Sequence, residues 1–339
     1  MSLNIWSEYI WLPEHVRWSD FEPRKINGTF VYFPQFEDLQ YSLLAGVILF
    51  FVRIFIECFV FLPIGLVGGW ISLPDDQSAL GLCFRHLNFG FAGKSKFKRV
   101  AETAWRFLYY TTIWFVGLYV LHDQPQFWDL DESWRQYPFH PISQSVWLYY
   151  IVETGFYWSL LFSAFTIDVK RSDFWQMAVH HAVTILLLSM SFIINFVRVG
   201  TMVVFCHDTA DILLEAGKLT RYARWEKLLT FLFCLLVIFW IGTRIFYFPL
   251  VIIRSVILVG PEMIQKNYRW LDLFQRPLIP RIFLFMLIIL VCLHVFWTVL
   301  LFQIAYKSTQ KSGDIDDIRE DSSDEDSDQQ RTRRGKKDD

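Results

Sequence analysis

Residues 281–306 read RIFLFMLIILVCLHVFWTVLLFQIAY, with one charged side chain, Arg281, at the very start. An apolar run of about 18 or more residues is long enough to cross the hydrocarbon core of a bilayer as one helix. Six further runs lie upstream, at 41–64, 104–121, 146–166, 174–194, 199–214 and 228–253. The sequence therefore predicts an all-α protein, a multi-pass transmembrane helical bundle of about seven spans.

The composition agrees with this prediction. Of the 339 residues, 54% are hydrophobic, and the 34 Phe and 15 Trp exceed ordinary usage. Aromatic rings at this density suit the membrane interface, where one edge of a ring meets water. No basic domain with interleaved aromatic residues occurs, which argues against nucleic acid as a partner. The five cysteines show no spacing typical of a zinc site or a disulfide framework.

Positive charges in the short loops predict the orientation. Lys and Arg gather after the first, third and fifth spans, in 85–99, 170–171 and 218–227, so these loops are expected in the cytosol. The loop 254–280 carries four basic residues and departs from the rule. With seven spans, the N-terminus lies in the lumen and the C-terminus in the cytosol.

Short motifs in the terminal segments agree with an endoplasmic reticulum protein in this orientation. Asn27 begins a glycosylation sequon, Asn-Gly-Thr, which is usable only in the lumen. Lys336 and Lys337 stand fourth and third from the end, as in a dilysine retrieval signal on a cytosolic tail. Ser322 and Ser323 precede acidic residues and fit phosphorylation by an acidophilic kinase such as casein kinase 2.

The spans divide the chain into five segments. Residues 1–40 are expected to form a lumenal N-terminal segment, 41–64 the first transmembrane helix, and 65–96 a cytosolic linker. Residues 97–307 hold the other six spans. Residues 308–339 are rich in charge and poor in apolar side chains, so a disordered acidic tail is expected there.

Ionisable side chains inside predicted spans are costly, so each needs a partner or a function. The most specific group of such residues consists of His180 and His181 in the fourth span and His207, Asp208 and Asp211 in the fifth. The fourth span starts at the cytosolic side and the fifth returns to it, so both sets lie at similar depth in the cytosolic half. In the fifth span, the i, i+3 and i, i+4 spacings to Asp211 place each pair on a shared helix face.

This group supports more than one chemistry. An imidazole held by a carboxylate is a good general base or nucleophile, because its second nitrogen stays free. A zinc or iron site is an alternative. However, adjacent histidines point about 100° apart on a helix, and the chain has no His-x-x-His box. A structural polar network between helices is the third interpretation.

Other polar residues within the spans are less specific. Arg53 and Glu57 are spaced i, i+4 in the first span and are expected to pair. Glu153 and Tyr157 share one face of the third span, which would suit a cavity wall. For these residues, and for Arg244, a structural partner is a simpler interpretation than a chemical role.

Several motifs together resemble the ceramide synthases, the longevity-assurance branch of the TLC-domain family. The region Arg198–Tyr222, with His207-Asp208-x-x-Asp211, matches the long family motif, and His180-His181 matches its histidine pair. The resemblance covers about 97–307. Many animal members carry a homeobox-like domain, for which 72–96 is too short. Further matches are Trp158-Ser159-Leu160-Leu161-Phe162-Ser163, Asp168-Val169-Lys170-Arg171, Trp105-Arg106-Phe107 and Thr243-Arg244.

The resemblance implies a TLC-type helical barrel around a lipid cavity. It also implies N-acylation of sphinganine or sphingosine by fatty acyl-CoA, giving (dihydro)ceramide and CoA without a cofactor. The catalytic group would be His180, His181, Asp208 and Asp211. The substrate-binding residues would be His207, Glu215, Glu153, Tyr157, Trp158 and Arg244. Acyl-chain length would depend on cavity depth, controlled near Ser255, Gly260 and Gln265.

Two mechanisms stay open at this point. In one, a histidine is the general base for direct attack of the amine on the thioester. In the other, which we favour, His180 takes the acyl group as an acyl-imidazole and passes it to the amine. In both, Asp208 and Asp211 are expected to orient the histidines, and the basic residues in 94–99 and 218–227 to hold the CoA phosphates.

Three other classes compete with a synthase. A non-catalytic TLC-family lipid transporter or sensor would use the same cavity without chemistry. A seven-span receptor fits poorly with the buried His and Asp residues, and a metal-dependent lipid hydroxylase would need more histidines. The expected partners are membrane lipids and, from the resemblance, a second ceramide synthase chain in a homo- or heterodimer.

Overall fold

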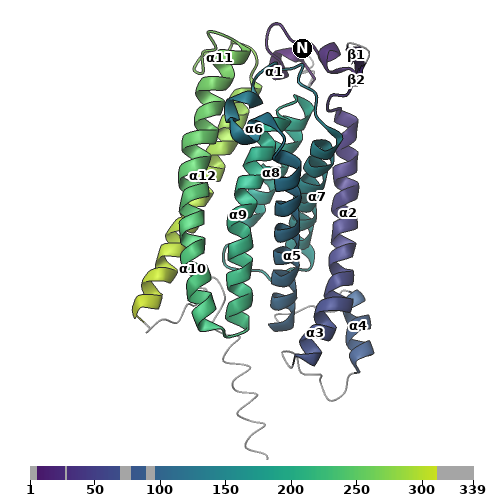
Figure 1. Cartoon of the computed structure of the whole chain (residues 1–339), viewed down its shortest axis with the longest axis vertical. Coiled ribbons are helices and arrows are strands. Elements are labelled where there is room, and N and C mark those ends of the chain that lie inside the picture. The colour runs from purple at the N-terminus through teal and green to yellow at the C-terminus, as the bar shows by residue number, and fades with distance from the viewer. Residues whose placement is uncertain (1–5, 27–28, 69–77, 89–95, 311–339) are drawn as a thin grey trace, which may run out of the picture.

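The computed structural model describes residues 6–26, 29–68, 78–88 and 96–310. Within these residues, seven long helical segments run side by side along one axis (Figure 1). Five of the segments are single helices: α5 (Lys96–Leu121), α7 (Gln144–Thr166), α8 (Phe174–Ile193), α9 (Val197–Tyr222) and α12 (Ile279–Gln310). The first segment is α2 (Leu39–Ile56), which continues as η3 (Glu57–Phe61) and α3 (Leu62–Val67). The sixth segment along the chain is α10 (Glu226–Trp240), which continues as η5 (Ile241–Ile253), η6 (Ser255–Val259) and α11 (Gly260–Ile264).

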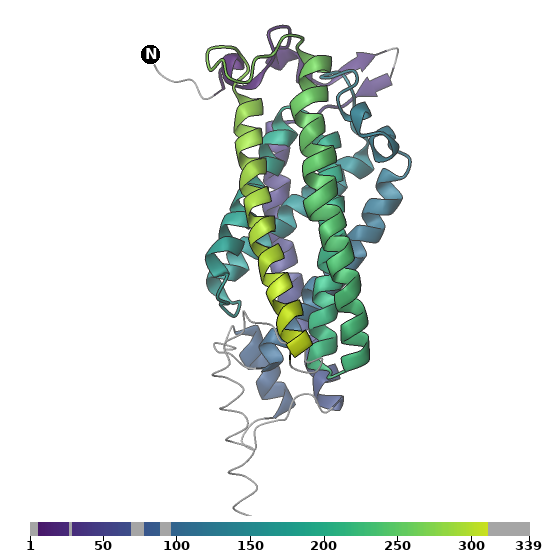
Figure 2. The same cartoon turned by 90° about the vertical axis from the view of Figure 1, so that its left-hand side faces the viewer.

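Short elements cover the two ends of the bundle (Figure 2). The hairpin end, where the N-terminal elements lie, carries α1 (Glu8–Trp11), η1 (Trp18–Phe21), β1 (Arg24–Ile26), β2 (Thr29–Val31), η2 (Phe36–Asp38), α6 (Pro125–Trp128) and η4 (Leu130–Ser133). The opposite end, here the α4 end, carries α4 (Ala79–Leu87) beside α3. β1 and β2 pair as a short antiparallel hairpin of three residues each. The described chain is otherwise built from helices and loops, so the all-α prediction is confirmed.

The protein is a membrane protein with several apolar helices. Four of the described segments are long and apolar enough to cross a membrane: Phe36–Val67, Phe174–Ile193, Glu226–Ile264 and Ile279–Ser308. The segments α5, α7 and α9 carry many buried polar side chains, which lowers their hydropathy. That these three segments cross the membrane, and hence the total of seven spans, stays a prediction.

Several helices are longer than predicted, and two of them extend well past their expected C-terminal ends. α9 ends at Tyr222 rather than near 214, and the helix that begins at Glu226 continues to Ile264 rather than ending near 253. Pro261 lies within this continuous helix, directly after the π-helical segment η6, and the Ile257 carbonyl oxygen four residues before it accepts a hydrogen bond from Trp270 Nε1 at 3.1 Å. Ser255 and Gly260 are therefore helical, and the predicted loop 254–280 is wrong for its first eleven residues.

Helices α2 and α7 touch backbone to backbone. A Cβ atom added at Gly155 would lie 2.7 Å from the Ala45 Cβ and 2.8 Å from the Ser42 carbonyl oxygen. A Cβ at Gly46 would lie 3.0 Å from the Cβ of Trp158. Trp158 thus packs against α2, away from the bundle centre, because the Gly46–Gly155 contact brings the two helices so close.

A buried ionic network joins the first span to the loop after α7. As predicted, Arg53 pairs with Glu57, at 2.7 Å between Nε and Oε1. Arg53 also binds Asp168, at 2.6 Å, and Asp168 binds Arg106, at 3.1 Å. Burial acts to raise the pKa of Asp168, but the two guanidinium groups outweigh it and hold this pKa well below the usual value. The loop 167–173 is thereby fixed against α2 and α5.

Candidate active site

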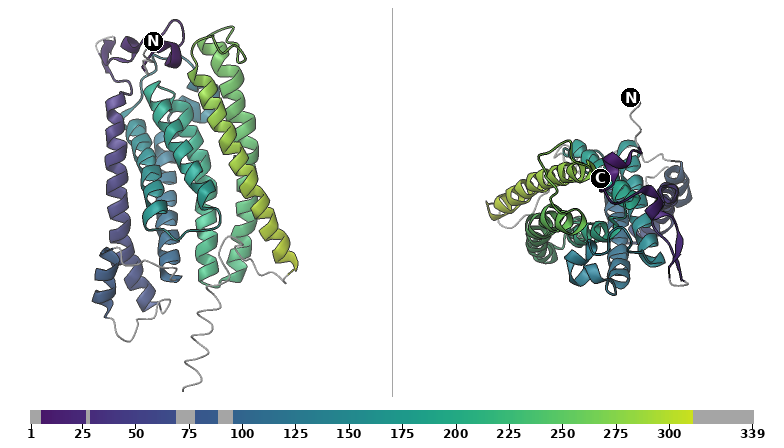
Figure 3. Two further views of the ribbon diagram at one scale, coloured as in Figure 1. Left: turned by 180° about the vertical axis from the view of Figure 1, so that it is seen from behind. Right: turned by 90° about the horizontal axis from the view of Figure 1, so that it is seen from above.

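A large cavity, here cavity 1, opens at the α4 end between α8, α9, α10 and α12. It holds about 1700 Å³ of space not filled by atoms, its open mouth included. α12 inclines away from the bundle toward this end (Figure 3). The walls from α10 and α12 are apolar, with Leu236, Leu300 and Leu301, whereas α8 and α9 supply His180, His181 and Asp211. Cavity 1 therefore joins three of the four predicted catalytic residues to a surface suited to lipid.

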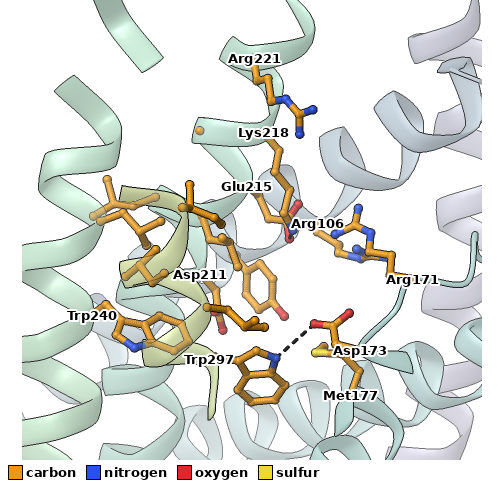
Figure 4. A pocket seen from close by; sticks show the side chains of 18 of the residues that line it. Arg106, Arg171, Asp173, Met177, Asp211, Glu215, Lys218, Arg221, Trp240 and Trp297 are labelled. Carbon is orange, nitrogen blue, oxygen red and sulfur yellow. Dashed lines mark hydrogen bonds and ion pairs between the residues drawn. The ribbon is translucent and has the colours of Figure 1, made fainter. Parts of the chain in front are cut away.

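The two histidines sit side by side at the inner part of cavity 1. Their ring centroids are 5.5 Å apart, and the Tyr157 ring lies 6.2 Å from His180 and 5.9 Å from His181. Trp297 meets His180 edge to face at 5.5 Å, and its Nε1 donates to Asp173 at 3.1 Å (Figure 4). Tyr157 and Trp297 thus hold the imidazoles by packing.

Neither imidazole has the carboxylate partner expected from the sequence. Among the described residues, the Nδ1 atoms of His180 and His181 have no hydrogen-bond partner. Asp211 lines cavity 1 but accepts a hydrogen bond from Arg244 Nη2 at 2.9 Å. A guanidinium competes better for a buried carboxylate than a neutral ring does. The expectation that Asp211 orients a histidine is therefore corrected: Asp211 pairs with Arg244.

Arg244 is buried and crosses between three helices. Its Nη2 also donates to the His207 carbonyl oxygen at 2.9 Å, and its Nη1 lies 3.3 Å from His294 Nε2. The guanidinium stacks over the Trp240 ring at 5.0 Å and lines cavity 1. Its Nε has no partner within the described chain. This places one fixed positive charge on the cavity wall near the histidines.

Asp208 faces the other way, toward α7. It is fully buried, as is Glu153, and the two carboxyl groups are neighbours across α7 and α9. None of their four oxygen atoms has a hydrogen-bond partner in the described residues that meets normal geometry. Neither residue lines cavity 1. The expectation that Asp208 contacts a histidine is thus not met, because α9 turns it about 60° away from Asp211.

His207 belongs to a layer that closes the inner end of cavity 1. Its ring packs against Phe248 and His294, with centroids 5.0 Å away in both cases. Asp211 and Arg244, one turn toward the α4 end, line cavity 1, while His207 and Phe248 line neither described cavity. We call His207, Phe248 and His294 the middle layer. The face shared by His207 and Asp211 is as predicted, but His207 is one turn too deep to reach cavity 1.

The mouth of cavity 1 is basic (Figure 4). Glu215 lines it and pairs with Lys218, at 2.7 Å. Lys98, in the other predicted phosphate-binding stretch, instead lies buried 3.5 Å from Glu57 in the ionic network. The cations that line the mouth are Arg106, Arg171, Lys218 and Arg221, and the carboxylates Asp168 and Asp173 line the same cavity.

A second cavity, here cavity 2, lies on the far side of the middle layer, at the hairpin end. It holds about 900 Å³ of space, and its lining is almost entirely apolar. Gly260 and Gln265, predicted to act on chain length, line it. Ser255 does not, because its hydroxyl accepts a hydrogen bond from Trp134 Nε1 at 2.8 Å on the outer side of this wall.

The remaining predicted residues divide into three cases. Tyr157 contacts both histidine rings but does not line cavity 1, and Trp158 contacts α2. Asn27, Ser322 and Ser323 lie outside the described residues. Within the described part of the chain, no three His, Cys, Asp or Glu side chains converge as they would to hold a metal ion.

Comparison with known proteins gives the family. The family model for the TLC domain matches residues 99–303. Ceramide synthase hyl-2 of Caenorhabditis elegans is 39% identical over 93% of both chains. The chain belongs to the ceramide synthase family of TLC-domain proteins. Ceramide synthase hyl-1 of the same worm is 40% identical over 94% of this chain and 84% of the relative, and human ceramide synthase 5 is 35% identical over 90% and 82%.

Sequence reasoning missed several residues around this ceramide synthase family site. Trp240 and Trp297 line cavity 1 beside the histidines, and Asp173 anchors Trp297. Arg106 stood in a matched motif, and Asp173 follows the matched stretch Asp168–Arg171 by two residues, so the motifs gave a signal for both. The two tryptophans lie in apolar runs where aromatic residues are common, and nothing in those runs separates them from their neighbours.

Proposed function

We propose that this chain is a ceramide synthase that N-acylates a long-chain sphingoid base with fatty acyl-CoA. The amine nitrogen forms a bond to the thioester carbonyl carbon, the carbon–sulfur bond breaks, and CoA leaves as the thiol with the proton from the amine. The observation that carries the proposal is cavity 1, where His180 and His181 meet an apolar wall and a basic mouth. No cofactor enters this reaction.

The proposal includes an orientation. The α4 end faces the cytosol, where acyl-CoA is found, and the hairpin end faces the lumen of the endoplasmic reticulum. The cations at the mouth support this, because basic residues prefer the cytosolic side. Membership in a family with ceramide synthases supports the chemistry, and seven spans would place both termini as predicted.

In the proposed mechanism, His180 attacks the thioester carbonyl carbon as nucleophile, the carbon–sulfur bond breaks, and the thiolate of CoA leaves, which gives an acyl-imidazole. The amine then attacks the same carbon, the bond between this carbon and the ring nitrogen breaks, and His181 or the freed His180 accepts the amine proton, which passes to the CoA thiolate. Its support is the position of His180 on the wall of cavity 1, next to Trp297, with no carboxylate bound to its ring. Arg244 places a positive charge on the same wall, which suits stabilisation of the oxyanion that forms on the carbonyl. General-base catalysis by the same histidine is the alternative mechanism.

The acyl chain is proposed to cross the middle layer and lie in cavity 2. On α9, Asp211 lines cavity 1 and Val203 lines cavity 2. On η5, Arg244 lines cavity 1 and Ile252 lines cavity 2. His207 and Phe248 lie between these positions, so a long acyl chain displaces the Phe248 ring to pass. A non-catalytic lipid carrier would use the same two cavities, and a dimer with another ceramide synthase is a further expectation of the family.

Product analysis separates the synthase from the carrier. The full chain is expressed in cells that lack their own ceramide synthases, and microsomes receive sphinganine with a panel of fatty acyl-CoAs. We expect dihydroceramide, quantified by mass spectrometry, together with an equal amount of free CoA. If a folded, membrane-inserted chain yields no product with any acyl-CoA, the synthase proposal fails and the carrier becomes the better interpretation.

Neutralising the mouth is expected to weaken acyl-CoA binding. Arg171→Gln with Arg221→Gln removes two cations that line the mouth. Because the sites are partly open to water, we expect the KM for acyl-CoA to rise about three- to tenfold, with kcat little changed. The effect should shrink at high salt. Arg135→Gln, at an exposed arginine of the hairpin end, is the matched control, and an equal rise in that variant contradicts the assignment.

A further inference from the structure

The N-terminal segment forms part of the wall of cavity 2. Trp11 and Pro13 line this cavity, although they lie far outside the matched domain at 99–303. The Trp11 ring is buried, and Leu12 and Val16 beside it are fully buried in the same core cluster. Trp134 and Tyr137 line the cavity from a second loop. The outer part of cavity 2 is thus built from large aromatic side chains.

This N-terminal wall is tied to the loop that follows α11. The Leu278 amide donates to the Ile10 carbonyl oxygen at 2.9 Å, and Arg276 Nη2 donates to the Pro13 carbonyl oxygen at 2.8 Å. These two contacts hold Ile10–Pro13 at both of its ends. Gln265, Tyr268 and Pro277 of the same loop also line cavity 2. The segment and the loop therefore form one cover over the cavity at the hairpin end.

Trp11 is also held from outside. Its ring stacks on Trp6, with centroids 5.9 Å apart, and lies 6.3 Å from the Trp18 ring. Trp18 packs in this aromatic cluster but does not line cavity 2. The cluster keeps the Trp11 indole in place, so that the end of cavity 2 has a fixed position rather than an adjustable one.

We propose that Trp11 is the end wall of the acyl-chain cavity and limits the longest acyl chain that the enzyme accepts. This inference rests on the proposed synthase function and on the acyl chain lying in cavity 2. Each methylene of the acyl chain that is buried against apolar side chains strengthens binding about fourfold. A two-carbon difference in chain length therefore changes the preference between two acyl-CoAs on the order of tenfold. A methylene that meets the Trp11 ring gains no such cover and meets a steric barrier.

The test compares product distributions. Wild type, Trp11→Ala, Trp11→Phe and Trp18→Ala are expressed in cells without other ceramide synthases. Microsomes then receive sphinganine and an equimolar mixture of saturated acyl-CoAs in two-carbon steps. For Trp11→Ala we expect the ratio of the next longer dihydroceramide to the wild-type product to rise on the order of tenfold. Trp11→Phe should shift the ratio in the same direction by less, and Trp18→Ala should keep the wild-type ratio.

The outcomes distinguish this inference from the proposed function. If Trp11→Ala is active and keeps the wild-type ratio, the end wall is elsewhere and the inference fails alone. If Trp18→Ala shifts the ratio as much as Trp11→Ala, loosening of the aromatic cluster explains the change and the inference also fails. If the Trp11→Ala protein does not accumulate in the microsomes, the Trp11→Phe variant tests the inference by the same ratio of longer to wild-type dihydroceramide, and an unchanged ratio in that variant contradicts it. If wild type makes no product, the proposed function fails first.

Discussion

Replacing His180 by Ala is expected to abolish dihydroceramide formation while the protein still accumulates in the membrane. His180 lines cavity 1 and carries no hydrogen bond from its Nδ1 to any described residue, so its loss removes no buried polar partner. We expect kcat to fall by about 10²–10⁴-fold for a general base, and further for a nucleophile. The measurement is the initial rate in microsomes at equal protein abundance.

A labelling experiment decides between the two roles. Wild type is mixed with radiolabelled acyl-CoA in the absence of sphinganine, and the precipitated protein is counted. An acyl-imidazole predicts label on wild type, no label on His180→Ala, and transfer of the label to sphinganine added later. His122→Ala, at an exposed histidine after α5, is the control and should behave as wild type. Full activity in His180→Ala would remove this residue from the chemistry.

Arg244→Gln is expected to destabilise the protein and to inactivate it. The guanidinium is buried and binds Asp211 and the His207 carbonyl oxygen, both at 2.9 Å. Removing one partner of a buried ion pair leaves the other charge uncompensated, which costs about 3–5 kcal/mol. We expect a lower Tm in detergent and a lower yield, measured by thermal unfolding and by immunoblot. Arg254→Gln, at an exposed arginine further along the same helix, should leave the Tm unchanged.

The double variant Arg244→Gln with Asp211→Asn separates stability from catalysis. Replacing Asp211 as well removes the uncompensated charge, so much of the lost Tm should return. Activity should stay low, because Arg244 lies on the wall of cavity 1 and its positive charge is gone. If activity returns together with the Tm, Arg244 only supports the fold and takes no part in stabilising the reaction.

The structure explains why the predicted site residues separate. The histidine pair lines cavity 1, because an apolar helix that starts at the α4 end carries both residues to the same depth. The role of the carboxylates did not follow from their spacing. Asp208 and Asp211 are three residues apart on α9, yet one meets Glu153 of α7 and the other meets Arg244 of η5. Helix periodicity gives the face of a residue but not the helix that will cover it.

The sequence by itself determined the helices and the local pairs. The run at 281–306 became α12, Ile279–Gln310, because apolar length alone sets a membrane helix. Arg53 and Glu57 paired because four residues make one helical turn. These features depend only on neighbours along the chain.

Only the tertiary structure decided which distant residues meet. Arg53 binds Asp168 across 115 positions of sequence, and Pro13 binds Arg276 across 263. The division into two cavities depends on Phe248 and His294 packing on His207 from separate helices. Such contacts follow from how seven helical segments pack together, because each helix face is equally free to meet several partners until the bundle is assembled.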